Sequence, residues 1–108
     1  MGKKVVVTFV NDKIEDRYVL LSENDRVKKK IDWIIEQIKI NPTFGEPIAK
    51  RLIPKYYKVN GISNAFWVSM SGDQRLIYSL TPISKTEINA TIIEWFTNHK
   101  SYDKRFGY

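Results

Sequence analysis

Alternating apolar and polar positions are clearest between Asn64 and Ile83, where they predict two β-strands joined by a tight turn. Gly72-Asp73 supplies the turn, because glycine adopts the positive φ angles that hairpin turns require. A third strand-like run extends from Glu87 to Trp95, so the three segments predict an antiparallel meander. In the second strand, one face carries Leu76, Tyr78 and Leu80, and the other carries Arg75, Ile77 and Ser79.

The other strong pattern is a helical stripe in the first half of the chain. Its apolar side chains recur at positions i, i+4, i+7, i+8 and i+11, which predicts one amphipathic helix. Ser22, with Asp25 three residues later, resembles a capping arrangement at its start, and Asn41-Pro42 ends it. We expect this helix to pack on the sheet face that carries Leu76. The stripe consists of Val27, Ile31, Ile34, Ile35 and Ile38.

Two weaker signals and one open segment remain. Lys4 to Val10 is nearly continuously apolar and predicts an opening strand that is covered on both faces. Gly45 to Lys58 predicts a short second helix, with Pro47 near its first position and Pro54 at its end. Asn11 to Ser22 fits either a helix or a loop.

Length and composition indicate a single domain over residues 1–108, which is long enough to bury a core of its own. The sequence contains no cysteine, so disulfides and thiolate chemistry are excluded. No apolar run approaches the roughly 20 residues that a membrane-spanning helix needs, and the basic N-terminus lacks the features of a secretory signal. We therefore expect a soluble, cytoplasmic protein with no membrane partner.

The formal net charge is +6, and the excess is concentrated on both sides of the meander. A basic domain commonly meets phosphate, although a solvated lysine-rich surface gives the same totals. In the tail, Tyr102, Phe106 and Tyr108 are costly to leave in water, so we expect the tail to dock on the body of the protein. The flanking basic residues are Lys50, Arg51, Lys55 and Lys58 before the meander, and Lys100, Lys104 and Arg105 after it.

Few residues of this chain can carry chemistry. One histidine and no cysteine exclude the usual zinc ligand sets, and the sequence has no glycine-rich phosphate loop. His99 can exchange protons near neutral pH, and Arg75 can hold a phosphate through two parallel hydrogen bonds. RNA cleavage without a metal needs such groups, because protons must move and the charge on phosphorus must be stabilised. Arg75, His99 and Tyr102 are therefore the candidate catalytic residues, and no cofactor or metal is expected.

Three stretches of the sequence together resemble the RelE/ParE toxin superfamily of type II toxin–antitoxin systems, and most of all its archaeal RelE-like proteins. They are KRLIPKYY (Lys50–Tyr57), the pattern of Trp67 followed by RLIY (Arg75–Tyr78), and the C-terminal EWFTNHKSYDKRFGY (Glu94–Tyr108). The resemblance covers the chain from about Gly45 onward, and the preceding residues match only in their strand–helix order.

The resemblance implies a RelE-like β-α-α-β-β-β order, an α+β fold with two helices on one side of a twisted, mainly antiparallel sheet and a docked basic C-terminal tail. It also implies ribosome-dependent cleavage of mRNA and a cognate antitoxin as the protein partner. Arg75 would then bind the scissile phosphate, His99 would donate or accept a proton, and Tyr102 would stack on a base or use its hydroxyl. The expected RNA-binding residues, in one positive groove with Arg75, are Lys50, Arg51, Lys55, Lys58, Lys100, Lys104 and Arg105.

The chain departs from the family pattern in two places. Asp73-Gln74 stands where Gly-Trp usually precedes the RLIY motif, which predicts weaker packing near Arg75. No acidic residue lies at the entrance of the meander, so the general base stays unassigned, with Glu46 as a candidate. Two alternatives remain open: a ParE-like toxin that acts on a topoisomerase, and a non-enzymatic nucleic-acid-binding relative of these toxins.

Overall fold

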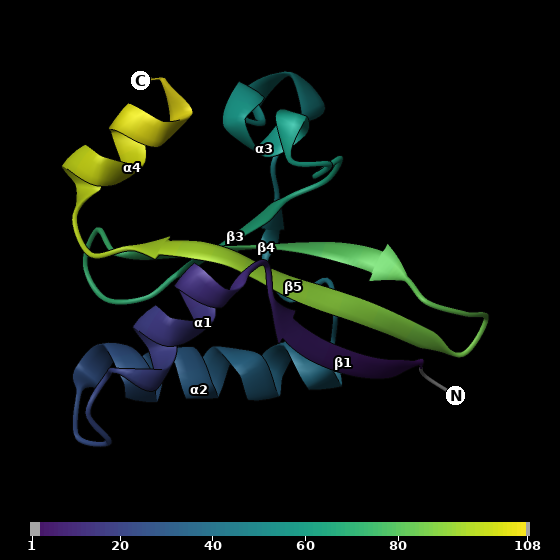
Figure 1. Ribbon diagram of the computed structural model, residues 1–108, viewed down its shortest axis with the longest axis horizontal. Helices are drawn as coiled ribbons and strands as arrows, with labels where there is room; N and C mark the ends of the chain where they lie inside the picture. The colour runs from purple at the N-terminus through teal and green to yellow at the C-terminus, as the bar shows by residue number, and fades with distance from the viewer. Residues whose placement is uncertain (1–2, 108) are drawn as a thin grey trace.

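The computed structural model describes residues 3–107, in which a five-stranded sheet has helices on both faces (Figure 1). The strand order is β1-β5-β4-β3-β2. The pair β1·β5 is parallel and the other neighbouring pairs are antiparallel, so this α+β protein has a mixed sheet. The strands are β1 (Lys4–Phe9), β2 (Glu46–Pro47), β3 (Phe66–Ser69), β4 (Arg75–Pro82) and β5 (Glu87–Phe96).

The helices form two layers, one on each face of the sheet. α1 (Asp12–Val19) and α2 (Arg26–Ile40) lie on one face, and α3 (Lys55–Val59) and α4 (His99–Phe106) lie on the other (Figure 1). The expectation of two helices on one side is therefore wrong, because both faces of the meander carry apolar side chains and both need cover. Among residues 3–107, no helix has the length and apolar character to cross a bilayer.

The meander and the helical stripe form as the sequence predicts. β3 pairs antiparallel with β4, and β4 pairs antiparallel with β5. The buried residues of the α2 stripe belong to one core cluster with the predicted face of β4, and Leu80 packs against that cluster. The fully buried residues that α2 and β4 contribute to this cluster are Ile31, Ile34 and Ile38 on α2, and Leu76 and Tyr78 on β4.

The helix predicted over Gly45–Lys58 is wrong. Its first residues instead form β2, which pairs with β3 at the edge of the sheet. The N–H of Gly45 donates to the hydroxyl of Tyr78 over 2.8 Å, and a Cβ at this glycine would lie 2.9 Å from the Tyr78 ring. A 3-10 turn at Lys50–Leu52 follows, and Pro54 caps the start of α3 instead of ending a helix. Two prolines and this tight strand pairing outweigh the helical pattern.

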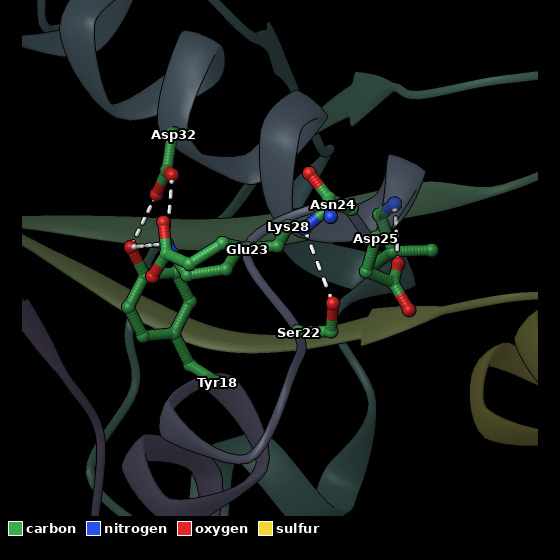
Figure 2. A network of polar contacts seen from close by, with 8 residues as sticks. Tyr18, Ser22, Glu23, Asn24, Asp25, Lys28 and Asp32 are labelled. Atoms are coloured by element: carbon green, nitrogen blue, oxygen red, sulfur yellow. Dashed lines mark hydrogen bonds and ion pairs between the residues drawn. The ribbon is translucent and has the colours of Figure 1, made fainter.

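The open segment before α2 is a helix, and a polar network joins the two helices (Figure 2). The hydroxyl of Tyr18, on α1, donates to the carboxylate of Asp32 on α2. Lys28 donates to the same carboxylate over 2.9 Å, and its ammonium lies 4.9 Å from the centroid of the Tyr18 ring. The network holds α1 in a fixed position relative to α2.

The start of α2 differs from the prediction. Asp25 is the N-cap, and its carboxylate accepts a hydrogen bond from the N–H of Val27 over 2.7 Å. Ser22 accepts instead from the N–H of Asn24 inside the loop, so it does not cap the helix (Figure 2). The other end lies at Asn41, before the proline, as the sequence predicts.

Candidate active site

Arg75 is the first residue of β4, and its guanidinium lies between two aromatic rings. Its Cζ is 4.3 Å from the centroid of Trp67, on β3, and 4.6 Å from the centroid of Tyr102, on α4. Arg75 forms no ion pair with a carboxylate anywhere in residues 3–107. Stacking on aromatic faces leaves the N–H edge of a guanidinium available for a planar or tetrahedral anion.

Tyr102 connects Arg75 to His99. The side chain of Tyr102 is only 4 % exposed, and its ring stacks on Phe106 with a centroid distance of 4.6 Å. The ring of His99 lies nearly parallel to that of Tyr102, at 15° and 6.5 Å between centroids. The three candidate catalytic residues therefore lie in one cluster. Stacking of an RNA base on Tyr102 does not fit this arrangement, because the ring is buried between protein groups.

His99 is exposed and is oriented from two sides. Its Nε2 lies 3.1 Å from a carboxylate oxygen of Asp103, one turn further along α4. Its backbone N–H donates to the carboxylate of Asp73 over 3.2 Å. Asn98 caps the same helix end, since its side chain accepts from the N–H of Ser101 over 2.8 Å. The contact with Asp103 leaves Nδ1 as the nitrogen that faces away from the helix partner.

Asp73, in the turn between β3 and β4, therefore takes part in building the cluster. Asp73-Gln74, where the family pattern has Gly-Trp, predicts weaker packing near Arg75. In the structure the carboxylate of Asp73 accepts a hydrogen bond from the backbone N–H of His99. Gln74 closes the turn, because its backbone carbonyl accepts from the N–H of Met70 over 2.9 Å. The hydrogen bond holds the start of α4 beside the start of β4.

Glu46, the candidate general base, is exposed on β2 and pairs in register with Trp67. Trp67 covers Arg75, so it stands between Glu46 and the cluster. No hydrogen bond or ion pair within residues 3–107 joins Glu46 to Arg75 or His99, and the structure gives Glu46 no role at this site.

The expected basic residues have several different surroundings. Lys50 and Lys58 line a cavity of about 450 Å³ in which Arg75 has no part. Arg105 is engaged elsewhere, as an ion pair with Glu94. The others lie exposed and form no ion pair within residues 3–107; they are Arg51, Lys55, Lys100 and Lys104.

Glu94 is a polar residue that sequence reasoning missed. A β-bulge explains why: Ile77 pairs with Glu94 but the next residue, Tyr78, pairs with Ile92, so Ile93 is an extra residue in β5. The bulge turns Glu94 toward α3 and α4, where the residue is only 9 % exposed. A polar residue in an apolar strand is the one sequence signal that marks this position.

Both oxygens of Glu94 are occupied. Arg105 donates from Nε over 2.9 Å and from Nη2 over 3.3 Å, and the hydroxyl of Tyr57 donates over 2.5 Å. Burial raises the pKa of the Tyr57 hydroxyl, and the adjacent charge of Glu94 raises it further. This group of three fastens α4 to α3 and β5. Tyr108, which we expect to dock with this tail, lies outside the described residues.

Within residues 3–107, no group of three or more histidine, cysteine, aspartate or glutamate side chains is arranged to hold a metal ion. No family model matches the chain, and no curated protein or solved structure is significantly similar to it. The cluster of Arg75, His99 and Tyr102 is therefore the basis on which a function can be proposed.

Proposed function

We propose that this protein is a RelE-like toxin of a type II toxin–antitoxin system, a ribosome-dependent endoribonuclease that cleaves mRNA and so inhibits translation. One observation carries the proposal: the Arg75 guanidinium is held between Trp67 and Tyr102 with no carboxylate partner among residues 3–107, and the His99 ring lies nearly parallel to the same Tyr102 ring. An arginine in this state is suited to bind a phosphate diester. An exposed histidine that neighbours the same tyrosine ring is suited to move a proton.

In this mechanism the ribose 2′-hydroxyl attacks phosphorus as its proton is removed. The bond from phosphorus to the 5′-oxygen breaks, and that oxygen takes up a proton as it leaves. Arg75 binds the phosphate oxygens and stabilises the charge that accumulates on them in the transition state. His99 carries out one of the two proton transfers through Nδ1, since Nε2 faces Asp103. Tyr102 is a positioning residue that fixes the guanidinium and the imidazole relative to each other.

The remaining cations support a nucleic-acid partner. Six exposed lysines and arginines that form no ion pair within residues 3–107 can bind the phosphate backbone of ribosomal RNA or mRNA, with an affinity that falls as salt rises. These six residues are Lys50, Arg51, Lys55, Lys58, Lys100 and Lys104.

A cognate antitoxin would bind the toxin in the cytoplasm and keep it inactive.

Controlled expression in bacteria tests the proposal, with growth and primer extension on translated messages as the two measurements. The parent should arrest growth and cut mRNA on ribosomes. His99→Gln should lower the cleavage rate by about 10²–10⁴-fold and leave ribosome binding nearly unchanged. Lys85→Ala, an exposed charge in the distant β4–β5 hairpin, is the matched surface control and should behave as the parent.

Two results would replace the proposal with one of its alternatives. If His99→Gln still arrests growth and no message is cut, the protein acts on another target, as a ParE-like topoisomerase poison would. If the parent neither arrests growth nor cuts mRNA, the basic surface belongs to a non-enzymatic nucleic-acid-binding protein.

A further inference from the structure

A polar cavity, distinct from the Arg75 cluster, lies where β1 ends and α1 begins. Its volume is about 330 Å³, within the range of small-ligand sites, and it is bounded by residues of α1, α3, β5 and α4. β1 and β5 run parallel, and their pairing ends at Phe9 and Ile92, so β5 continues past its neighbour. Ligands of open sheets commonly bind in the crevice outside the carboxyl ends of parallel strands.

The cavity carries an unbalanced positive charge. The carboxylate of Glu94, in its wall, is already paired with Arg105. Lys13 and Arg17 also line the cavity, and neither forms an ion pair in the part of the chain that the structure describes. The guanidinium of Arg17 is held in place by the ring of Trp95, with Cζ 4.3 Å from the centroid. An anion with more than one oxygen fits such a pair of cations.

The opposite wall fits a planar, polar group. Tyr56 is about half exposed, and the guanidinium of Arg105 covers its ring at 4.2 Å. Asn11 uses Oδ1 to accept from the N–H of Ile14, and its Nδ2 has no partner within residues 3–107. Asn60 uses Nδ2 to donate to the carbonyl of Tyr56, and its Oδ1 likewise has none there. One donor and one acceptor beside an aromatic ring are what the edge and face of a nucleobase require.

The structure assigns this cavity to a nucleoside phosphate, with the phosphate on Lys13 and Arg17 and the base between Tyr56 and the two asparagines. The site is separate from the Arg75 cluster. Arg105 and His99 lie on opposite flanks of the α4 stripe that contains Tyr102 and Phe106, given 3.6 residues per turn. The inference is independent of RNA cleavage, because binding alone tests it.

Titration of the full-length chain with AMP, GMP, CMP and UMP, followed by calorimetry and by backbone amide NMR, provides the test. At least one mononucleotide should bind and shift the amides of Asn11, Arg17 and Tyr56. Lys13→Ala and Arg17→Ala should each weaken binding about tenfold, as expected for loss of one charge-assisted hydrogen bond. Lys85→Ala and Arg26→Ala remove matched exposed charges outside the cavity and should leave binding unchanged.

Two further titrations identify the source and the limits of the ligand. Inorganic phosphate should bind more weakly than the mononucleotide, and equal affinity would overturn the base-binding half of the inference. A short RNA that displaces the mononucleotide identifies an RNA end or loop as the source, whereas a mononucleotide that RNA cannot displace identifies a small metabolite. The inference fails if neither ligand shifts the cavity amides, or if Lys13→Ala, which alters only an exposed side chain, binds as the parent does.

The two sites can be judged separately. Arg75→Ala should lower cleavage by about 10²–10³-fold and keep mononucleotide binding, because Arg75 does not line this cavity. A loss of mononucleotide binding in Arg75→Ala would show that the ligand sits at the cluster instead, and would overturn the assignment.

Discussion

The backbone N–H of His99 donates a hydrogen bond to the carboxylate of Asp73 over 3.2 Å, and this bond ties the first turn of α4 to the β3–β4 turn. Arg75 begins β4 two residues after Asp73. The bond therefore sets the distance between the proposed phosphate ligand and the proposed proton carrier. Asp73 and His99 are both exposed, so the hydrogen bond between them affects the geometry of the cluster more than the stability of the fold.

Asp73→Ala should lower the mRNA cleavage rate about five- to tenfold, because α4 loses its anchor at the end that carries His99. The free energy of unfolding should fall by only about 1 kcal/mol, as for one exposed hydrogen bond. Asp73→Asn keeps an acceptor oxygen and should restore most of the rate. A parental cleavage rate in Asp73→Ala would show that the β3–β4 turn does not position His99.

Arg75→Lys keeps the positive charge but removes the planar group that lies between Trp67 and Tyr102. We expect cleavage to fall about 10- to 100-fold in single-turnover assays, since a lysine cannot offer two parallel donors to one phosphate. The cleavage rate of Arg75→Ala should be lower still, about 10²–10³-fold below that of the parent. Equal activity of Arg75→Lys and the parent would mean that the positive charge alone is needed, and that stacking of the guanidinium on Trp67 and Tyr102 does not contribute to catalysis.

Ile34→Asp should strongly destabilise the protein. Ile34 is 0 % exposed in the core between α2 and the sheet, and a carboxylate there has no partner, so we expect a loss of about 4 kcal/mol or more. Ile40→Asp makes the same change at the end of the same helix, where the side chain is 78 % exposed, and should change stability little. Urea denaturation followed by circular dichroism measures both. Similar midpoints for the two variants would contradict the described packing of α2.

The alkaline limb of the stability profile should depend on Tyr57. Burial, with a further effect from Glu94, raises the pKa of its hydroxyl above the ordinary value of 10.0. Above pH 10 the unfolded chain loses this proton while the native state keeps it. Stability is therefore complete below about pH 10 and then declines, by up to about 1.4 kcal/mol per pH unit for this group.

Tyr57→Phe should flatten that decline, and urea midpoints measured between pH 8 and pH 11 give the slope. The variant should also lose about 1–3 kcal/mol at neutral pH, since Glu94 loses one donor. Tyr56→Phe is the control, because the neighbouring ring is about half exposed. Parallel slopes for the parent and Tyr57→Phe would mean that Tyr57 is not protected in the native state.

Period-2 and period-3.6 patterns were enough to predict the meander and the α2 stripe, because burial of one face leaves a direct mark on the sequence. The edge strand β2, which begins directly after Gly45, follows no such pattern. Its position depends on the hydrogen bond from Gly45 to Tyr78, 33 positions away. Parallel pairing of β1 with β5 is likewise set by topology and not by local preference.

The candidate site was predictable only in part. Residue chemistry pointed to Arg75, His99 and Tyr102, and the aromatic side chains of the tail predicted that it docks on the body of the protein. The role of Asp73 depends on a contact across 26 residues, which no local pattern encodes. Glu94 was hidden by the bulge, because one extra residue breaks the alternation from which its direction would be read.

The pairing of β1 with β5 also determines when this protein can fold during its own synthesis. Thr8 and Asn89, 81 positions apart, share a hydrogen bond of 3.0 Å across these two strands. A nascent chain must therefore keep β1 unpaired, and α2 without its full sheet cover, until residues 87–92 have left the exit tunnel. Long-range pairing of this kind is slow to form and leaves apolar segments open to chaperones. His99 emerges later still, so under the proposed function a growing polypeptide could not yet cleave the message from which it is being translated.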